Sequence, residues 1–154
     1  MKLLAMLLLC ASLRAGEEQP IPFSHKTHTK SGIKCQDCHT LKKPGFAAGL
    51  PKEQTCMGCH ATIKADSPPI QKLAEYAKAN KPVPWVRIYR LPDYVWFSHA
   101  VHHQEAALAC ETCHGPVAER EVVTKEKPIT MIACMDCHRQ NKAPNGCNVC
   151  HDTR

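Results

Sequence analysis

Ten of the 11 cysteines in the chain occur in pairs that are separated by two residues and followed directly by a histidine. The five segments are Cys35-Gln36-Asp37-Cys38-His39, Cys56-Met57-Gly58-Cys59-His60, Cys110-Glu111-Thr112-Cys113-His114, Cys134-Met135-Asp136-Cys137-His138 and Cys147-Asn148-Val149-Cys150-His151. C-x-x-C-H is the attachment signature of c-type haem: two thiols bind the vinyl groups of one porphyrin and the histidine binds its iron. The spacing therefore predicts five covalently bound haem c groups.

Other uses of paired cysteines fit the sequence less well. A structural zinc site takes four ligands from paired knuckles, and five clusters cannot be paired off evenly. Neither zinc binding nor a disulfide framework requires a histidine directly after every second cysteine. Only Cys10 lies outside the five motifs, so haem attachment accounts for every other thiol.

The histidine count agrees with two axial imidazoles for each of five haem irons. Five of the 10 histidines end the attachment motifs and are the predicted proximal ligands, His39, His60, His114, His138 and His151. The remaining five are the predicted distal ligands, His25, His28, His99, His102 and His103. Met131, three residues before Cys134, is the alternative axial ligand to His103, and its thioether would raise the potential of that haem.

Four of the distal candidates lie in two copies of one pattern, Phe-Ser-His-x-x-His, at residues 23–28 and 97–102. An attachment motif follows each copy after a similar interval, beginning at Cys35 and at Cys110. Histidines three residues apart lie on one side of a helical turn. Each copy is therefore expected to bind two neighbouring haems.

The segments between the motifs are rich in Gly, Pro and Lys, so we expect a mainly irregular chain with short α-helices. Residues 17–66 are predicted to form a di-haem module and residues 97–154 a tri-haem module. Residues 67–96 would link them through a helix capped by Ser67 and an extended aromatic arm. Aromatic residues make up only 5% of the chain, so the compact, internally duplicated fold is expected to have a haem-filled core.

Residues 1–16 are predicted to be a signal peptide, with Lys2 at a positive start, an apolar stretch over residues 3–9 and small residues after it. Cys10 offers a second route to the membrane as a lipidated cysteine. No later segment reaches 18 consecutive apolar residues, so no transmembrane helix is expected after the leader. We therefore expect a periplasmic or exported protein, with membrane attachment through a partner or through Cys10.

The formal net charge of +6 does not indicate a nucleic-acid partner. The 20 basic residues are scattered and form no long basic run. The propionate groups of five haems would also cancel this positive excess. We therefore expect no binding to nucleic acid.

The motif order resembles that of the class III and c7-like multihaem cytochromes c. The resemblance rests on Phe23, Ser24, His25 and His28 ahead of the Cys35 motif. It implies that the first histidine of each pattern binds the haem of the following motif. The implied axial pairs are His25 with His39 and His99 with His114, while His28 and His102 serve other haems.

A closer resemblance, to the pentahaem subunit of alternative complex III, covers most of the chain after the leader. It rests on the order of Trp85-Val86-Arg87, Leu91-Pro92-Asp93-Tyr94-Val95-Trp96-Phe97-Ser98-His99, Cys113-His114-Gly115-Pro116-Val117 and Met131 before Cys134. This resemblance implies a place in a quinol-oxidising respiratory complex of a bacterial membrane.

These observations predict a periplasmic pentahaem cytochrome that passes single electrons between redox partners. The partners would be other cytochromes or a membrane quinol-oxidising complex. Two axial imidazoles on each iron leave no place for a substrate, so the chain is expected to be a carrier and not an enzyme. Two alternatives remain: a multihaem reductase with one open haem site, and a filament-forming cytochrome that takes a distal histidine from its neighbour.

Overall fold

The computed structural model describes residues 18–41 and 45–151. The predicted signal peptide and Cys10 lie outside these residues. Short helices joined by irregular segments make up the described chain: α1 (His25–Lys30), α2 (Cys35–Cys38), α3 (Glu53–His60), α4 (Pro68–Ala79), the π-helical η1 (Ala100–Glu105), α5 (Glu111–His114), the 3₁₀ turn η2 (Val117–Glu119), α6 (Met131–Gln140) and α7 (Cys147–Cys150). The β-pairing of the described residues is one isolated bridge, between Val95 and His151. The expected fold class, mainly irregular with short α-helices, is confirmed.

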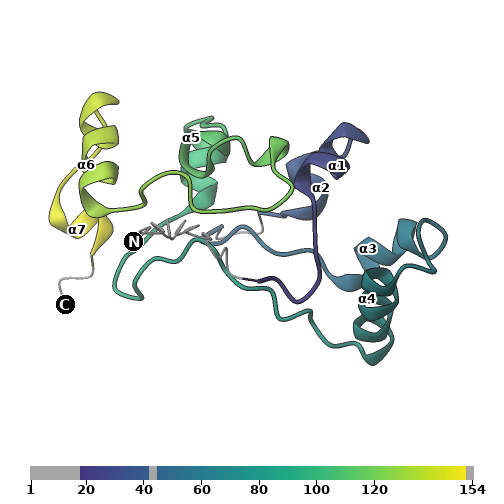
Figure 1. Cartoon of the computed structure of the whole chain (residues 1–154). Helices are drawn as coiled ribbons and strands as arrows, with labels where there is room; N and C mark the ends of the chain where they lie inside the picture. The colour runs from purple at the N-terminus through teal and green to yellow at the C-terminus, as the bar shows by residue number, and fades with distance from the viewer. Residues whose placement is uncertain (1–17, 42–44, 152–154) are drawn as a thin grey trace, which may run out of the picture.

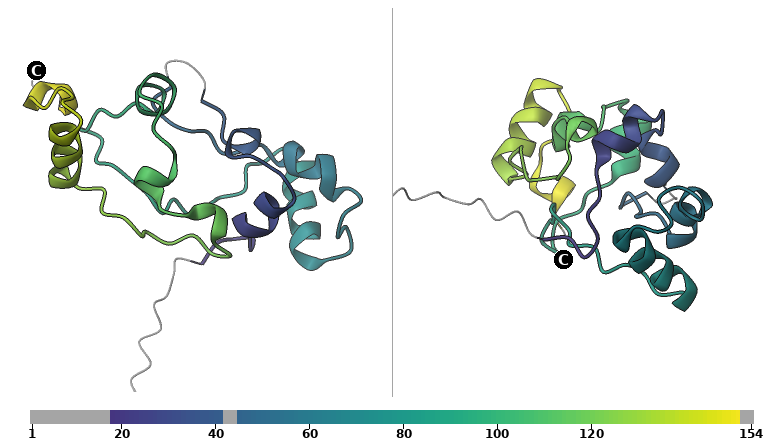
Figure 2. Two further views of the ribbon diagram at one scale, coloured as in Figure 1. Left: turned by 90° about the horizontal axis from the view of Figure 1, so that it is seen from above. Right: turned by 45° about the vertical axis from the view of Figure 1, so that its right-hand side comes forward.

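The helices are arranged along an elongated molecule. Figure 1 shows α3 and α4 at one end, α6 and α7 at the other, and α1, α2 and α5 between them. The same order is visible from above and after a 45° turn about the vertical axis in Figure 2. The five attachment motifs are therefore distributed from one end of the molecule to the other.

Every attachment motif lies on a helical turn. α2 and α7 consist of the four residues from the first cysteine to the second, and α3 and α6 contain their motifs towards the carboxyl end. In α5 the first cysteine, Cys110, is the N-cap residue. A helical turn places residues three apart on the same side, so the two thiols of each motif can reach one porphyrin.

The buried apolar residues of the described chain are Ile21, Leu73 and Val83. They lie where α4 packs against α3, and Trp85 is among the partly buried residues around them. Glu53, at the start of α3, is also buried, and its Oε1 accepts a hydrogen bond of 2.7 Å from the amide of Val83. Aliphatic packing thus stabilises one end of the molecule and little of the remainder.

The helix expected after Ser67 is α4. Proline occupies its first two positions, where no amide donor is needed and the ring favours the helical φ angle. It ends at Asn80, which adopts the left-handed conformation with φ of 50°. Because α4 packs on α3, the helix of the predicted linker belongs in space to the end that carries the second attachment motif.

The aromatic arm after α4 is a strap over residues 85–97, interrupted by a turn at residues 93–94, that contacts widely separated parts of the chain. The amide of Val86 donates to Gln19, and the hydroxyl of Tyr89 donates to the carbonyl of His114. Further along, the amide of Trp96 donates to the carbonyl of Cys150 at 2.7 Å. The strap therefore joins the α3–α4 end of the molecule to α7.

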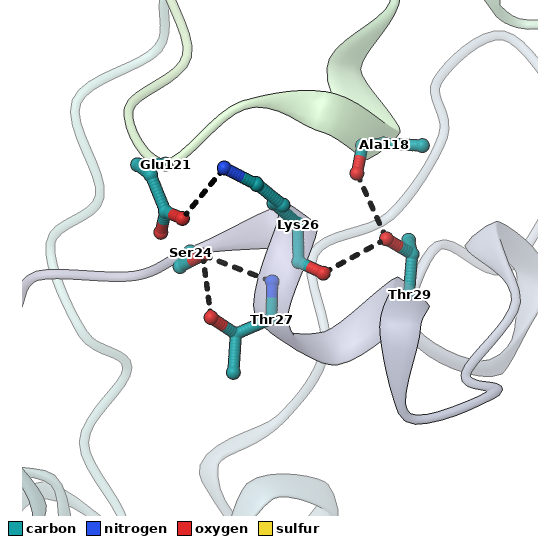
Figure 3. Close-up of polar contacts among 6 residues, drawn as sticks. All are labelled: Ser24, Lys26, Thr27, Thr29, Ala118 and Glu121. Carbon is teal, nitrogen blue, oxygen red and sulfur yellow. Dashed lines mark hydrogen bonds and ion pairs between the residues drawn. The ribbon is translucent and has the colours of Figure 1, made fainter.

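Helix α1 is fixed to the other half of the chain through η2 (Figure 3). The hydroxyl of Thr29 donates to the carbonyl of Ala118 at 2.8 Å, and Nζ of Lys26 lies 3.4 Å from Oε1 of Glu121. The amide of Lys26 also donates to the carbonyl of Arg120. These contacts hold the first Phe-Ser-His-x-x-His copy against the segment that follows the third attachment motif.

Over residues 18–41 and 45–151, none of the helices combines the length and apolar character needed to cross a bilayer.

Candidate haem-binding sites

The first histidine of each Phe-Ser-His-x-x-His pattern faces a histidine that ends an attachment motif. The ring centroids of His25 and His39 are 6.3 Å apart, and the ring planes differ by only 9°. The rings of His99 and His114 are 6.4 Å apart, with an angle of 5° between their planes. Both pairs are those implied by the resemblance to the c7-like cytochromes.

The second histidine of each pattern faces the proximal histidine of a different motif. His28 pairs with His60 at a centroid distance of 6.1 Å and an interplanar angle of 62°. His102 pairs with His138 at 5.9 Å and 40°. The sequence left open which haems these two distal histidines would serve, and this assignment comes from the structure.

The spacing of the four pairs fits a haem iron between the rings. Two metal–imidazole bonds of about 2 Å, together with the distance from each Nε2 to its ring centre, separate the centroids of an axial pair by about 6 Å. The four measured separations lie between 5.9 and 6.4 Å. The residues present therefore suit bis-imidazole ligation at the first four motifs.

Backbone carbonyl groups orient most of the imidazoles through Nδ1, which leaves Nε2 as the metal-binding nitrogen. Three proximal rings use a carbonyl from the loop after their own motif, at Gly49, Ile63 and Pro144. The histidines with such an Nδ1 contact are His28, His39, His60, His99, His102, His103, His138 and His151. These carbonyl partners could not be predicted from the sequence, because they depend on the conformation of the loops.

The Phe and Ser residues of the repeated pattern have a structural role that the sequence analysis did not assign. Phe23 stacks on His28 at 4.4 Å and 22°, and meets His25 edge-on at 4.8 Å and 84°. Around Phe97 the second copy repeats this geometry, with 4.4 Å and 26° for the stacked ring and 4.8 Å and 89° for the other. The carbonyl of each serine accepts from the second histidine. The exact repeat of four residue types could have signalled this shared geometry.

Two of the facing imidazoles are kept neutral by their surroundings. Burial, followed by the neighbouring His39 and His28, lowers the pKa of His25 to about 4. Burial also lowers the pKa of His114, with His99 and His39 as further causes. A neutral imidazole is the form that binds a metal, so both environments suit an axial ligand.

His103 and His151 do not form a fifth pair. Nε2 of His103 lies 2.8 Å from Nε2 of Gln36, in the first attachment motif. The ring of His151 instead lies against Tyr94, with centroids 5.9 Å apart and an angle of 30°. Adjacent residues of a helix point in directions roughly 100° apart. His102 faces His138 and His103 is turned towards α2, so this arrangement gives no support to the predicted role of His103 at the fifth site, which stays a prediction.

Met131, the alternative named from the sequence, is the first residue of α6 and is 63% exposed. Its side chain is therefore accessible, and Met131 stays the predicted alternative to His103 as the fifth distal ligand.

All ten thiols of the attachment motifs are free. Burial raises the pKa of five of them. For four of these five thiols the next cause is the thiol of another motif. These neighbours are Cys38 for Cys56, Cys35 for Cys110, Cys137 for Cys113 and Cys150 for Cys134. Thiols of different motifs thus lie close to one another along the molecule.

The sequence model of the family "Cytochrome c7 and related cytochrome c" matches residues 21–80 and matches again at residues 95–153. The chain therefore belongs to this family of multihaem cytochromes c, and the double match agrees with the duplicated Phe-Ser-His-x-x-His pattern. The chain is also similar to the protein named menaquinone reductase, multiheme cytochrome c subunit, from Nitratidesulfovibrio vulgaris. The two are 34% identical over 167 residues, which cover 90% of this chain and 79% of the relative. The chain is thus a multihaem cytochrome c, and this supports a function in electron transfer.

Proposed function

We propose that this protein is a periplasmic pentahaem cytochrome c that passes single electrons between a redox partner and a menaquinone-reducing membrane complex. The observation that carries the proposal is the set of four imidazole pairs at the spacing of axial ligands. The name of the similar protein supports the choice of complex. The resemblance seen in the sequence pointed to a complex that oxidises a quinol. The complex proposed here also acts on a quinone, but it would reduce the quinone with electrons from the cytochrome.

Different residues of the chain would attach the five porphyrins and bind their irons. The ten thiols of the motifs would attach the porphyrins, and His39, His60, His114, His138 and His151 would bind the irons on the proximal side. His25, His28, His99 and His102 would complete four of the sites. A bound haem supplies reversible one-electron chemistry at iron, whose potential depends on its axial ligands.

The same ligands favour a carrier over an enzyme. Imidazoles would bind the iron from both sides at the first four motifs, so these sites would leave no coordination place for a substrate. At the second and fourth sites, carbonyl groups hold both rings through Nδ1, which opposes release of either ligand there. The chain itself would therefore transfer electrons, and the chemistry on menaquinone would belong to other subunits.

A periplasmic location is supported by the leader over residues 1–16, which has the charge and apolar pattern of a signal peptide. The membrane complex would then hold the protein at the outer surface of the inner membrane. Cys10 would supply a lipid anchor if the leader is processed at that residue.

Mass spectrometry of the exported protein tests the number of haems. We expect the mass of the processed chain plus five haems, together with low-spin electron resonance signals of bis-imidazole iron. A chain with fewer haems, or with zinc, would contradict the proposal. Strong binding of nitrite or carbon monoxide at one of the first four sites would instead favour the multihaem reductase.

Isolation of the protein with its native neighbours tests the proposed complex. We expect it to copurify with membrane subunits that reduce a menaquinone analogue when the cytochrome is supplied with electrons. Isolation of long fibres of the cytochrome alone, without such subunits, would favour the filament-forming alternative.

A further inference from the structure

Each Phe-Ser-His-x-x-His copy connects two attachment motifs directly. His25 and His28 are one turn apart on α1, and they face the proximal histidines of the first and second motifs. The second copy connects the third and fourth motifs in the same way. Side chains three residues apart on a helix lie about 5–6 Å from each other at Cβ. The first site is therefore adjacent to the second, and the third site to the fourth.

The loop after the first motif packs against the second copy. Nδ1 of His99 contacts the carbonyl of Phe46 at 2.9 Å, and the amide of Ala100 donates to the carbonyl of Gly45 at 3.1 Å. Gly45 has a φ of +76°, and a Cβ there would lie 2.3 Å from Cβ of Ala100. Only glycine allows this approach. The first and third sites are thus neighbours, although the second motif separates them in the sequence.

The fourth and fifth motifs are joined by the short segment between α6 and α7. The carbonyl of Pro144, in this segment, contacts Nδ1 of His138 at 2.6 Å. The side chain of Asn145 donates to the carbonyl of Met135, inside the fourth motif. The fifth site therefore adjoins the fourth.

The two ends of this series lie far apart. Figures 1 and 2 place α3, with the second motif, at the opposite end of the molecule from α7, with the fifth. The strap contacts Gln19 through Val86 and Cys150 through Trp96. The second and fifth motifs therefore lie at opposite ends of the described chain.

We infer that the five attachment motifs form one unbranched row in the order second, first, third, fourth, fifth. The row rests on the proposed function and makes it more specific: redox partners would exchange electrons with the chain at the haems of the second and fifth motifs. The four neighbouring thiol pairs described above follow the same order, as second with first, first with third, third with fourth, and fourth with fifth.

The duplicated copies supply a matched pair of variants to test this order. His28 and His102 occupy the same position in their patterns and have the same phenylalanine and carbonyl contacts. Replacing either by methionine, in His28→Met or His102→Met, should raise the potential of one haem, because a thioether replaces an imidazole. That haem then accepts its electron at a higher potential than in the unaltered protein. The negative charge that it gains lowers the reduction potentials of the nearest haems.

The readout is the number of other haems whose midpoint potentials move, followed for each haem by NMR during stepwise reduction. For His28→Met we expect one secondary shift, at the first haem, because the second site is at an end. For His102→Met we expect two, at the third and fifth haems, because the fourth site is internal. If the two variants changed the midpoint potentials of the same number of other haems, the inferred order of the motifs would be wrong.

If a variant fails to take up its haems, the unaltered protein still allows the order of the motifs to be tested. An experimental structure of the unaltered, haem-loaded protein should show the first iron nearest to the second and third, and the longest separation between the second and fifth. A first iron adjacent to the fourth or fifth would contradict the inference. A protein without five haems would instead refute the proposed function, so the two failures are distinguishable.

Discussion

The histidines of this chain differ in the groups that surround their rings, and these groups decide whether a ring can act as an axial ligand. His102 and His103 are adjacent, and both have Nδ1 held by a backbone carbonyl at 2.8 Å. Only His102 faces a proximal imidazole, whereas Nε2 of His103 contacts Gln36. At the scale of the residue, the direction of a ring decides between a ligand and a hydrogen-bonding side chain.

This difference leads to a prediction for two alanine variants. His102→Ala should remove one bis-imidazole signal from the low-temperature electron resonance spectrum and introduce a high-spin signal. His103→Ala should leave the low-spin signals unchanged, because no proximal ring lies opposite it. Loss of a low-spin signal in His103→Ala would restore His103 as the fifth distal ligand.

At the scale of the element, α3 and α4 form the part of the chain that is stabilised by ordinary packing. Leu73 on α4 is buried with Ile21 and Val83. Glu53 at the start of α3 accepts the amide hydrogen of Val83 and thereby fixes the chain after α4. Because the buried amide of Val83 donates to this carboxylate, the acceptor oxygen at residue 53 should matter more for stability than its negative charge.

We expect Glu53→Ala to lower the free energy of unfolding by about 1–3 kcal/mol, the usual cost of a buried polar group without a partner. Glu53→Gln keeps an acceptor oxygen and should lower it by less. Denaturant unfolding of the haem-loaded protein, followed by circular dichroism, measures both values. If glutamine and alanine proved equally destabilising, the hydrogen bond to Val83 would not be the reason.

At the scale of the whole molecule, the described chain has too small an apolar core to fold by itself. Three apolar residues of the described chain are buried, whereas ordering each residue costs roughly 1–2 kcal/mol of conformational free energy. The apolar faces of the porphyrins would supply the missing buried surface, with the chain wrapped around the row of sites. Covalent attachment would hold them even where a site is shallow.

The haem-free chain, produced without the haem-attachment machinery, should therefore be largely unfolded. Its circular dichroism should show little helix and no cooperative thermal transition, in contrast to the haem-loaded protein from the same gene. A cooperative transition of the haem-free chain would mean that the polypeptide has a sufficient core of its own.

The attachment chemistry could be predicted from the sequence, because attachment depends on local spacing. Cys-x-x-Cys-His specifies both thiols and the proximal imidazole within one helical turn. The pattern around His25 and His28 repeats closely enough to predict two ligand pairs and the short helix that carries them. These features need no information about distant parts of the chain.

The tertiary structure alone decided which distal ring meets which proximal ring beyond the first of each pair. His28 with His60, His102 with His138, and the separation of His103 from His151 depend on how loops bring distant segments together. The order of the sites has the same origin, since the close approach of Gly45 to Ala100 sets the first motif beside the third. Spacing along a chain fixes local geometry, but contacts between remote segments follow only from the folded path.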